Sequence, residues 1–313
     1  MDFMLFSLLN GIAYGLLLFM ISSGLTLIFG MMGVLNFAHA SFYMLGAYLA
    51  FAISGRFGFV AGVIAATILV ASMGMLIERF LLRKVHLFGH GHELLLTFGL
   101  ALVIDEVIKL FFGNFPVNYT VPSALDFSAF TLSGMSYPFY RLFIALVAIA
   151  MFTILFLLLR HTRIGLIVRA AERAPTMAQA LGHDVPTIFT GVFGLGAGLA
   201  GLAGAVAGAF YPTNPNMALE LGAIVFVVVV IGGLGSLAGS LIASLGIGVL
   251  TSLTVGIDFR LADLAAGVGL GDWANEVGGL MTVPISVLSG AVPFILMLLV
   301  LLTRPAGLLG ARN

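Results

Sequence analysis

The sequence predicts an all-α fold: a polytopic bundle of transmembrane helices with about eight or nine membrane segments, some of them broken or re-entrant. Hydrophobic residues make up 61% of the 313 residues and charged residues only 8%, against about 45–50% and about 25% in a soluble domain. The apolar residues occur in long runs, and the chain holds 40 glycines. We therefore expect a single transmembrane domain over residues 1–313. No basic group precedes the first run, so we expect a retained span and not a cleaved signal peptide.

Individual apolar stretches approach the length of about 20 residues that a helix needs to cross a hydrocarbon core of about 30 Å. They run from Phe3 to Phe29, Asn36 to Ile53, Phe57 to Phe80, Glu93 to Phe112, Pro138 to Leu159, Pro186 to Phe210, Met217 to Gly232, Leu234 to Val255 and Thr282 to Thr303. The stretches after Asn36 and after Met217 are short and contain glycine. Either could be a broken or re-entrant helix that lines a cavity and does not cross fully.

The positions of Lys and Arg predict the orientation, because positive residues are retained on the cytoplasmic side. One set of loops holds Arg79, Arg83, Lys84, Arg160, Arg163, Arg169, Arg173, Arg304 and Arg312, and the opposite set holds only Arg56, Arg141 and Arg260. With nine crossings, the N-terminus lies outside and the C-terminus in the cytoplasm. Two long outer loops then follow, Gly113 to Tyr137 and Gly256 to Met281, and the second contains Asp258, Asp263, Asp272, Trp273 and Glu276.

Small residues recur at three- and four-residue steps in two places, which puts them on one stripe of a helix. The first set is Gly194, Gly198, Gly201, Ala205 and Gly208, and the second is Gly232, Gly235, Gly239, Ala243 and Gly246. Such stripes let helix backbones approach closely. Tight packing is the ordinary explanation, and a functional hinge is the alternative.

Several kinds of chemistry are missing from the sequence. The formal net charge is zero, which excludes the basic footprint of a nucleic-acid-binding protein, and cysteine is absent. Neither lysine, Lys84 or Lys109, follows a glycine, so the chain has no P-loop of its own. His86, His90 and His92 lie near Glu93 and could imitate a metal site, but we favour a solvated loop because no second shell is evident. We expect no enzymatic activity and no metal or other cofactor in this chain.

The segment from 160 to 185 is the least hydrophobic of the expected cytoplasmic stretches. Pro175 suits the first turn of a helix and Gly182 suits a C-terminal cap, so a short helix from about Pro175 to Leu181 is predicted. Its alanines would let it insert into a groove of another protein at little side-chain entropy cost. A loop that only retains positive charge on the inner side explains the residues equally well.

The stretch Asn36-Phe37-Ala38-His39-Ala40-Ser41-Phe42-Tyr43-Met44-Leu45-Gly46-Ala47-Tyr48 resembles the motif after the first span of LivH-type permease subunits of branched-chain amino-acid ABC transporters. Further stretches resemble the same family: Gly24 to Gly30, Thr97 to Leu100, Arg169 to Gly182, Gly194 to Phe210, Gly232 to Gly239 and Arg304 to Gly310. Together they cover most of the chain. Two departures stand out: Ala40 replaces a common glycine, and the outer loop from Gly256 to Met281 is longer and more acidic than expected.

The resemblance implies one permease subunit of an ATP-driven importer in a bacterial inner membrane. Its partners would be a second homologous permease subunit, two cytoplasmic ATP-binding subunits that hold ATP and Mg, and a periplasmic solute-binding protein. The 160–185 segment would be the coupling loop. The residues that contact the ATPase would then be Arg169, Glu172, Arg173, Ala174, Ala178, Leu181 and Gly182.

Polar groups at membrane depth are candidate functional residues because burying them in lipid is costly. Asp105, Glu106 and Lys109 can pair at three- and four-residue spacing on one helix, and we favour that pairing over substrate contact. Glu220 either receives the ammonium of an amino acid or faces outer water.

The second, short segment supplies the remaining candidates for the substrate path, Asn36, His39, Ser41 and Tyr43. Asn36 could instead cap the helix, and His39 could bind a backbone carbonyl.

The residues leave the cargo open. Branched-chain or related amino acids follow from the resemblance, and urea, short amides or small carboxylates fit the same architecture. An ion-driven secondary transporter that acts alone is a further alternative. It needs ion ligands at mid-membrane, and the sequence places few there.

Overall fold

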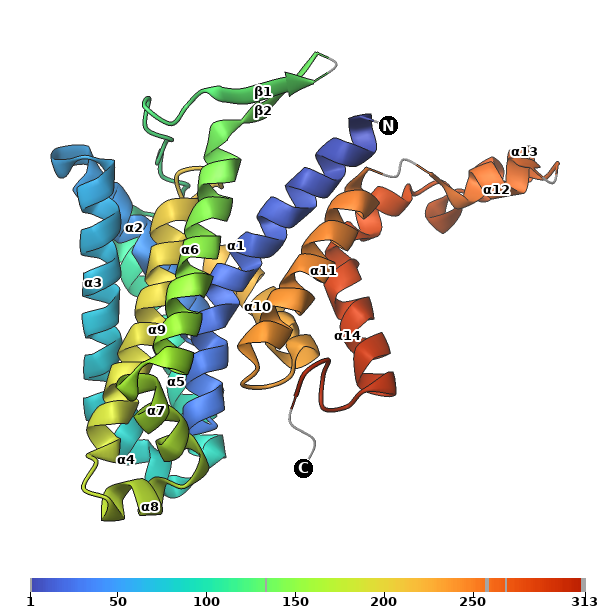
Figure 1. Ribbon diagram of the computed structural model, residues 1–313. Helices are drawn as coiled ribbons and strands as arrows, with labels where there is room; N and C mark the ends of the chain where they lie inside the picture. The colour runs from blue at the N-terminus through green and yellow to red at the C-terminus, as the bar shows by residue number, and fades with distance from the viewer. Residues whose placement is uncertain (1, 133, 257–258, 268, 311–313) are drawn as a thin grey trace.

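The computed structural model describes residues 2–132, 134–256, 259–267 and 269–310 and shows a helical bundle with one small β-hairpin (Figure 1). The predicted all-α fold is confirmed. Asp258 and Arg312, which the sequence analysis assigns to the outer loop and to the cytoplasmic set, lie outside the described residues. We refer to the two ends of the bundle as the hairpin end and the α8 end, after the elements that mark them in Figure 1.

The elements follow one another in short-looped order. They are α1 (Asp2–Met32), α2 (His39–Phe57), α3 (Phe59–Ile77), the π-helix η1 (Glu78–Leu82), α4 (Arg83–Val85), the 3-10 helix η2 (His86–Phe88), α5 (His90–Phe112), β1 (Ser128–Leu132), β2 (Met135–Pro138), α6 (Phe139–His161), α7 (Arg163–Arg173), α8 (Pro175–Ala180), α9 (Val185–Ala207), α10 (Met217–Gly232), α11 (Leu237–Val255), α12 (Leu261–Gly267), α13 (Gly271–Val277), the 3-10 helices η3 (Gly279–Met281) and η4 (Ile285–Ala291), and α14 (Val292–Thr303). The strands β1 and β2 pair antiparallel, with Phe130 opposite Tyr137.

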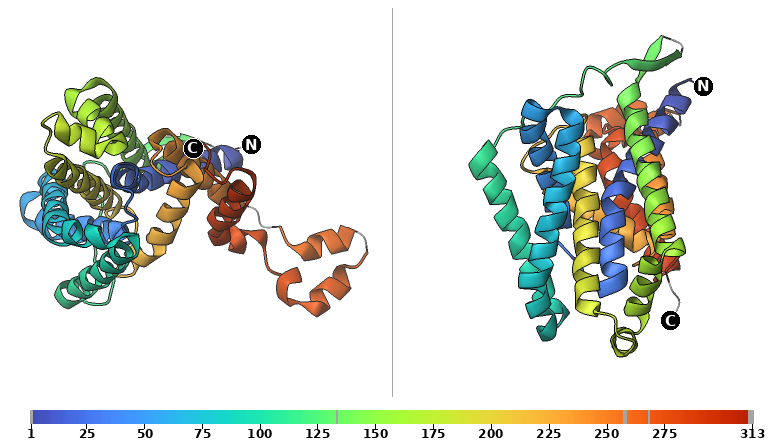
Figure 2. Two further views of the ribbon diagram at one scale, coloured as in Figure 1. Left: turned by 90° about the horizontal axis from the view of Figure 1, so that it is seen from below. Right: turned by 60° about the vertical axis from the view of Figure 1, so that its left-hand side comes forward.

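Six helical stretches in the described residues are long and apolar enough to cross a membrane. They are Met4–Met32, Phe59–Phe88, Phe139–His161, Val185–Ala207, Leu237–Val255 and Ser286–Thr303. The helices α2, α5 and α10 run beside them between the two ends of the bundle (Figure 2), which agrees with the predicted eight or nine segments. The last predicted stretch is not one α-helix, because it begins as the 3-10 helix η4 and continues as α14.

The membrane path is broken between α1 and α2, as predicted for the stretch after Asn36. Residues 33–36 have no regular secondary structure, and α2 begins at His39. The ring of His39 contacts the carbonyl oxygen of Ile21 at 2.8 Å. Ile21 precedes the last residue of α1, Met32, by about 16 Å of helix at 1.5 Å per residue. The chain therefore climbs back along α1 before α2 starts, and α2 starts deep inside the bundle.

The first small-residue stripe, on α9, is a site of close backbone packing. A Cβ atom on Gly201 would lie 2.8 Å from Val70 of α3, and one on Gly204 would lie 1.8 Å from the carbonyl oxygen of Tyr43 on α2. A Cβ atom on Gly196 would lie 2.8 Å from the carbonyl oxygen of Gly24 on α1. These spacings leave no room for a side chain, so α9 packs directly on three helices.

The second stripe forms a turn at the α8 end of the bundle. Gly233 has φ +99°, which only glycine adopts without strain, and it lies against Gly310 near the C-terminus. The amides of Leu308 and Leu309 donate to the carbonyls of Ile231 and Gly232. The C-terminal segment is thus fastened onto the turn between α10 and α11.

Replacing Gly204 by alanine is expected to destabilise the bundle by about 1–3 kcal/mol, because the new Cβ would overlap the backbone of α2. The matched control is Gly191→Ala on the same helix, where a Cβ meets nothing within 4 Å and alanine favours the helix by about 1 kcal/mol. The check is the melting temperature of each purified variant in detergent. Equal melting temperatures would contradict the close approach of α2 and α9.

Candidate functional site

A cavity of about 430 Å³ lies where α2 begins. Its walls come from the segment before α2, from α5, from α10 and from α14, and they are mostly apolar. The lining residues are Leu25, Leu35, Asn36, Phe37, His39, Ala40, Ser41, Phe98, Ala101, Leu102, Asp105, Ala218, Leu219, Gly222, Ala223, Val225, Phe226, Val227, Phe294 and Met297. The polar members number few against this apolar lining, which is the usual composition of a small-molecule site.

The start of α2 is held open by hydrogen bonds from both sides. The side-chain oxygen of Asn36 accepts from the amide of Ala38 at 3.0 Å, and the amide of Phe37 donates to the hydroxyl of Thr97 on α5 at 3.3 Å. Among the described residues, the amides of Ala40 and Ser41 have no hydrogen-bond acceptor. They are the free donors that the first turn of a helix exposes, and they carry its positive partial charge.

Asn36 and His39 keep one unpartnered polar atom each, although both side chains are buried. Asn36 is 3% exposed and its Nδ2 has no partner; His39 is 1% exposed and its Nδ1 has none. The turn that Asn36 closes before α2 agrees with the capping alternative, and His39 does bind a backbone carbonyl, at Ile21. Both residues nevertheless line the cavity, so these bonds leave them available to a ligand.

Asp105 is a cavity residue that sequence reasoning missed. Its Oδ1 accepts a hydrogen bond from the hydroxyl of Ser41 at 3.1 Å. The favoured pairing of Asp105 with Lys109 is wrong, because Lys109 pairs with Glu106 at 2.6 Å instead. The spacing of three and four residues allowed either partner. Only the position of α2 beside α5 shows that Asp105 faces a cavity.

Two other predicted residues of the substrate path lie elsewhere. Tyr43 is 1% exposed in the core and does not line the cavity. Glu220 lies in the first turn of α10, is exposed, and is not a lining residue either. Their roles in transport stay predictions.

The segment from 160 to 185 folds as two helices, and sequence reasoning found only the second. In α7 the inward residues Gly165, Val168 and Ala171 follow one another at three-residue steps, a helical period that the sequence already carried. The predicted short helix is α8, and it ends one residue earlier than predicted, at Ala180. Gly182, at φ +89°, ends it as predicted.

The residues predicted to contact a partner differ in exposure. Ala178 is only 2% exposed and faces the body of the protein, so it positions α8 and is not itself a contact surface. Leu181 is 73% exposed, and so is Met177 at 62%. Ala174 and Gly182 lie exposed at the two ends of α8. The apolar surface available to another protein is therefore that of Met177 and Leu181.

The charged residues of this segment bind to their own chain to different degrees. Arg169 donates to the carbonyl of Leu159, while Glu172 and Arg173 are exposed on the last turn of α7. Partial desolvation raises the pKa of Glu172, and the nearby Arg173 and Arg169 oppose that shift. Hydrogen bonds from the hydroxyl and amide of Thr187 hold the pKa of Asp184 below its ordinary value.

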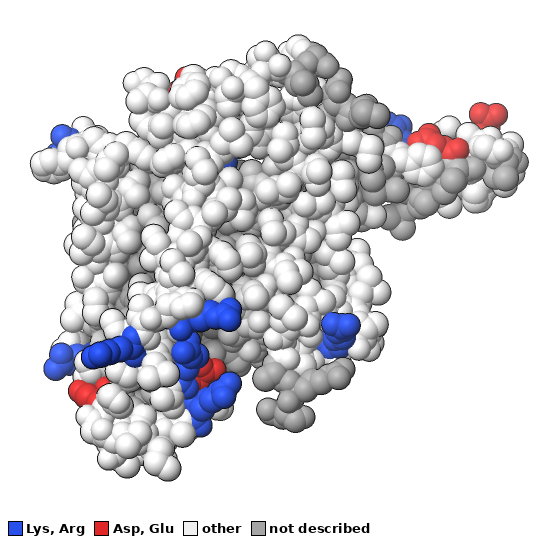
Figure 3. Space-filling view, in the orientation of Figure 1, with Lys and Arg blue, Asp and Glu red and all other residues white. Residues whose placement is uncertain are grey.

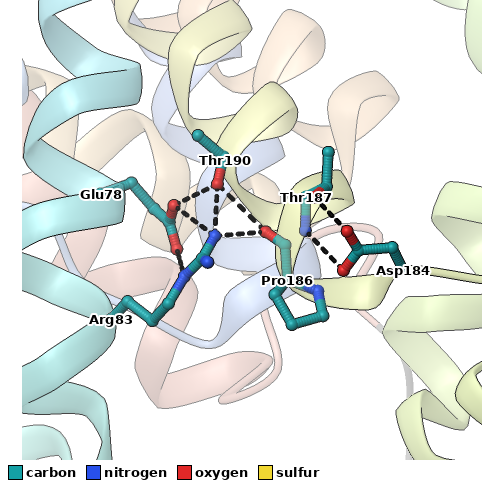
Figure 4. Close-up of polar contacts among 6 residues, drawn as sticks. All are labelled: Glu78, Arg83, Asp184, Pro186, Thr187 and Thr190. Atoms are coloured by element: carbon teal, nitrogen blue, oxygen red, sulfur yellow. Dashed lines mark hydrogen bonds and ion pairs between the residues drawn. The ribbon is translucent and has the colours of Figure 1, made fainter.

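A polar network fastens the start of α9 to the region after α3 (Figure 4). The carboxylate of Glu78 is 2% exposed and pairs with Arg83 at 3.2 Å. Arg83 also donates to the carbonyl of Pro186 at 2.7 Å and to the hydroxyl of Thr190, which in turn donates to Glu78. Because α8 leads directly into α9, this network sets where α8 is held.

The three histidines near Glu93 form no metal centre, since the described residues contain no group of three or more His, Asp or Glu side chains suited to hold an ion. Glu93 is 1% exposed, and His86 and His90 both bind its carboxylate through Nδ1. A second cavity, of about 1040 Å³, lies beside this region and is lined by Glu78, Arg83, His86, Glu172 and Gln179 among others.

Comparison with known proteins identifies similar sequences along almost the whole chain. The family described as "Branched-chain amino acid transport system / permease component" matches residues 7–301. The "High-affinity branched-chain amino acid transport system permease protein LivH" of Salmonella typhimurium is 28% identical, over 96% of this chain and 94% of that protein. The corresponding protein BraD of Pseudomonas aeruginosa is 26% identical, over 97% and 94%. The "Probable branched-chain amino acid transport permease protein LivH" of Methanocaldococcus jannaschii is 28% identical, over 78% and 79%. No solved structure matches the chain.

Replacing Arg83 by methionine is expected to destabilise the protein by about 1–3 kcal/mol, because the buried carboxylate of Glu78 loses its cation. The double variant with Glu78→Gln should recover much of this loss, since an amide costs less to bury than an unpaired charge. Thermal unfolding in detergent measures both. A double variant no more stable than Arg83→Met alone would show that the ion pair is not the cause.

Proposed function

This chain belongs to the branched-chain amino acid transport system permease family, and from that premise we propose that it is the transmembrane permease subunit of an ATP-driven importer. The observation that carries the proposal is the cavity at the start of α2, deep in the bundle, where an otherwise apolar wall offers free helix-start amides and the polar side chains of Asn36, Ser41 and Asp105. A broken helix beside a cavity is how transporters present polar backbone to a solute inside the membrane.

The cargo proposed is a branched-chain or related amino acid. Two kinds of observation support it: the printed names of the relatives, and the aliphatic and aromatic side chains of the cavity, such as Leu102, Phe98 and Phe226. Burial of an apolar side chain against such a wall contributes about 25 cal/mol per Å² of apolar area. Urea and short amides have almost no apolar area to bury, so this wall favours them less.

Energy for uptake is proposed to come from two cytoplasmic ATP-binding subunits, because the sequence has no P-loop. The helix α8 would be the coupling element, with Met177 and Leu181 exposed toward the ATPase. In this scheme ATP and Mg are bound by those partners. Closure of the ATPase pair moves α8, and the motion passes into α9 through the network of Arg83 and Glu78.

The charge distribution supports the proposed orientation. Lys and Arg side chains gather around the α8 end, and acidic side chains mark the α12–α13 arm at the hairpin end (Figure 3). Positive residues are retained on the cytoplasmic side, so the α8 end is inside and the N-terminus is outside. A periplasmic solute-binding protein would then meet the hairpin end.

A second permease subunit is proposed to cover the open side of the cavity. Seen along the bundle, the ribbons of α5 and α10 diverge on either side of α2 (Figure 2). The outward side chains there are large and apolar: Leu95 is 72% exposed, Leu110 80% and Leu219 80%. Those surfaces suit lipid or a homologous chain.

The proposal is tested by purifying a tagged chain from its native membrane and identifying the proteins that accompany it. We expect ATP-binding subunits and a second permease chain, and ATP-dependent uptake of L-leucine when the assembly is placed in proteoliposomes. The chain alone should move none. Uphill uptake by the isolated chain would contradict the proposal and favour an ion-driven transporter.

Replacing Leu181 by aspartate is expected to abolish ATP-driven uptake while leaving the chain in the membrane, because a charge would then face the apolar ATPase groove. Leu166→Asp on α7 is the control, since Leu166 is 63% exposed and lies outside α8. Uptake in proteoliposomes and ATPase activity measure the effect. Undiminished uptake by Leu181→Asp would remove the coupling role from α8.

A further inference from the structure

We propose that the break before α2 is a binding site for the two charged groups of an amino-acid zwitterion. The carboxylate would be held by Asn36 and the free amides of α2, and the ammonium by Asp105. This inference rests on the proposed function and adds to it the residues, and the polarity, of the substrate site.

The start of α2 is suited to an anion. The amides of Ala40 and Ser41 have no hydrogen-bond acceptor among the described residues, and the dipole of the 19-residue helix α2 places partial positive charge there. Asn36 adds a further donor: its side-chain oxygen is used by Ala38, so its Nδ2 points elsewhere, and that atom is buried without a partner. A buried donor left unsatisfied costs about 1–3 kcal/mol, and a bound carboxylate would remove that cost.

Asp105 is suited to the cation. No Lys, Arg or His side chain of the described residues lies within ion-pairing distance of its carboxylate, because the nearby Lys109 pairs with Glu106. The hydroxyl of Ser41 satisfies one of its oxygens at 3.1 Å, and the remaining lone pairs face a cavity that Asp105 lines. A half-buried carboxylate without a cation is the group that an ammonium ion stabilises.

Ser41 brings the two halves to the spacing of an α-amino acid. Its backbone amide belongs to the anion side, and its hydroxyl contacts Asp105. The two charged groups of an α-amino acid are attached to one carbon, so they also lie within a few ångströms of each other. The volume of about 430 Å³ leaves room for the side chain against Phe98, Leu102 and Phe226, within the range of about 300–1,000 Å³ that small-molecule sites have.

The test measures binding of three probes to the purified full-length chain in lipid nanodiscs by saturation-transfer difference NMR. The probes are L-leucine, isocaproate, which lacks the ammonium, and isoamylamine, which lacks the carboxylate. Asp105→Asn should weaken L-leucine and isoamylamine about tenfold or more and spare isocaproate. Asn36→Asp keeps the oxygen that Ala38 needs and should weaken L-leucine and isocaproate while sparing isoamylamine. Each variant thus retains one ligand that shows it is folded.

Glu106→Gln is the matched control, because Glu106 is the next residue on α5, has a side chain 72% exposed and does not line the cavity. It should bind all three probes like the wild type. If Asp105→Asn or Asn36→Asp weakened the two half-ligands equally, or weakened none, the site would be overturned.

Uptake of L-leucine by the assembled transporter is measured in parallel to separate the two proposals. Uptake by the wild-type assembly that survives both substitutions overturns the site alone and leaves the proposed function intact. A wild-type assembly that transports no L-leucine overturns the proposed function. Uptake that is lost in both cavity variants and retained in Glu106→Gln supports both proposals.

Discussion

Between α1 and α2 the chain leaves the helical conformation while it is still inside the bundle, and there its backbone polar groups must be satisfied by the protein itself. Asn36 supplies an acceptor to Ala38, and Thr97 of α5 supplies one to Phe37. The ring of His39 joins the start of α2 to Ile21 of α1. Three helices are thereby tied to one interruption. The amides that remain free are the ones that line the cavity, so the same irregularity that threatens stability creates the site.

Close packing around α9 makes that interruption possible. A Cβ on Gly24 would meet both the ring of His39, at 2.9 Å, and the backbone of Gly196, at 2.3 Å. Larger residues would push α1, α2 and α9 apart and move His39 away from Ile21. Helices in a membrane gain little from hydrophobic exclusion against each other, so such close van der Waals contact carries much of their association. The small residues therefore support the cavity without lining it.

At the α8 end the structure separates residues that hold α8 from residues that it presents. Ala178 faces the protein and Leu181 faces away, although both belong to one short alanine-rich segment. Arg83, Glu78 and Thr190 fix the base of α9 next to it. A rigid attachment is what a coupling element requires, because a movement imposed on α8 must reach α9 and not be absorbed by a flexible loop.

The sequence by itself determined the class of fold, the break after the first span, the end of α8 at Gly182 and the uneven distribution of positive charge. These features depend on composition, on helical period and on the conformational freedom of glycine, all of which are local. Only the tertiary structure decided that Asp105 contacts Ser41 and not Lys109, that Tyr43 and Glu220 lie outside the cavity, and that Ala178 points inward. A helical period shows which residues share a face, but the neighbour that covers the face comes from a distant part of the chain. The partner of a buried polar group is therefore chosen by packing and not by spacing.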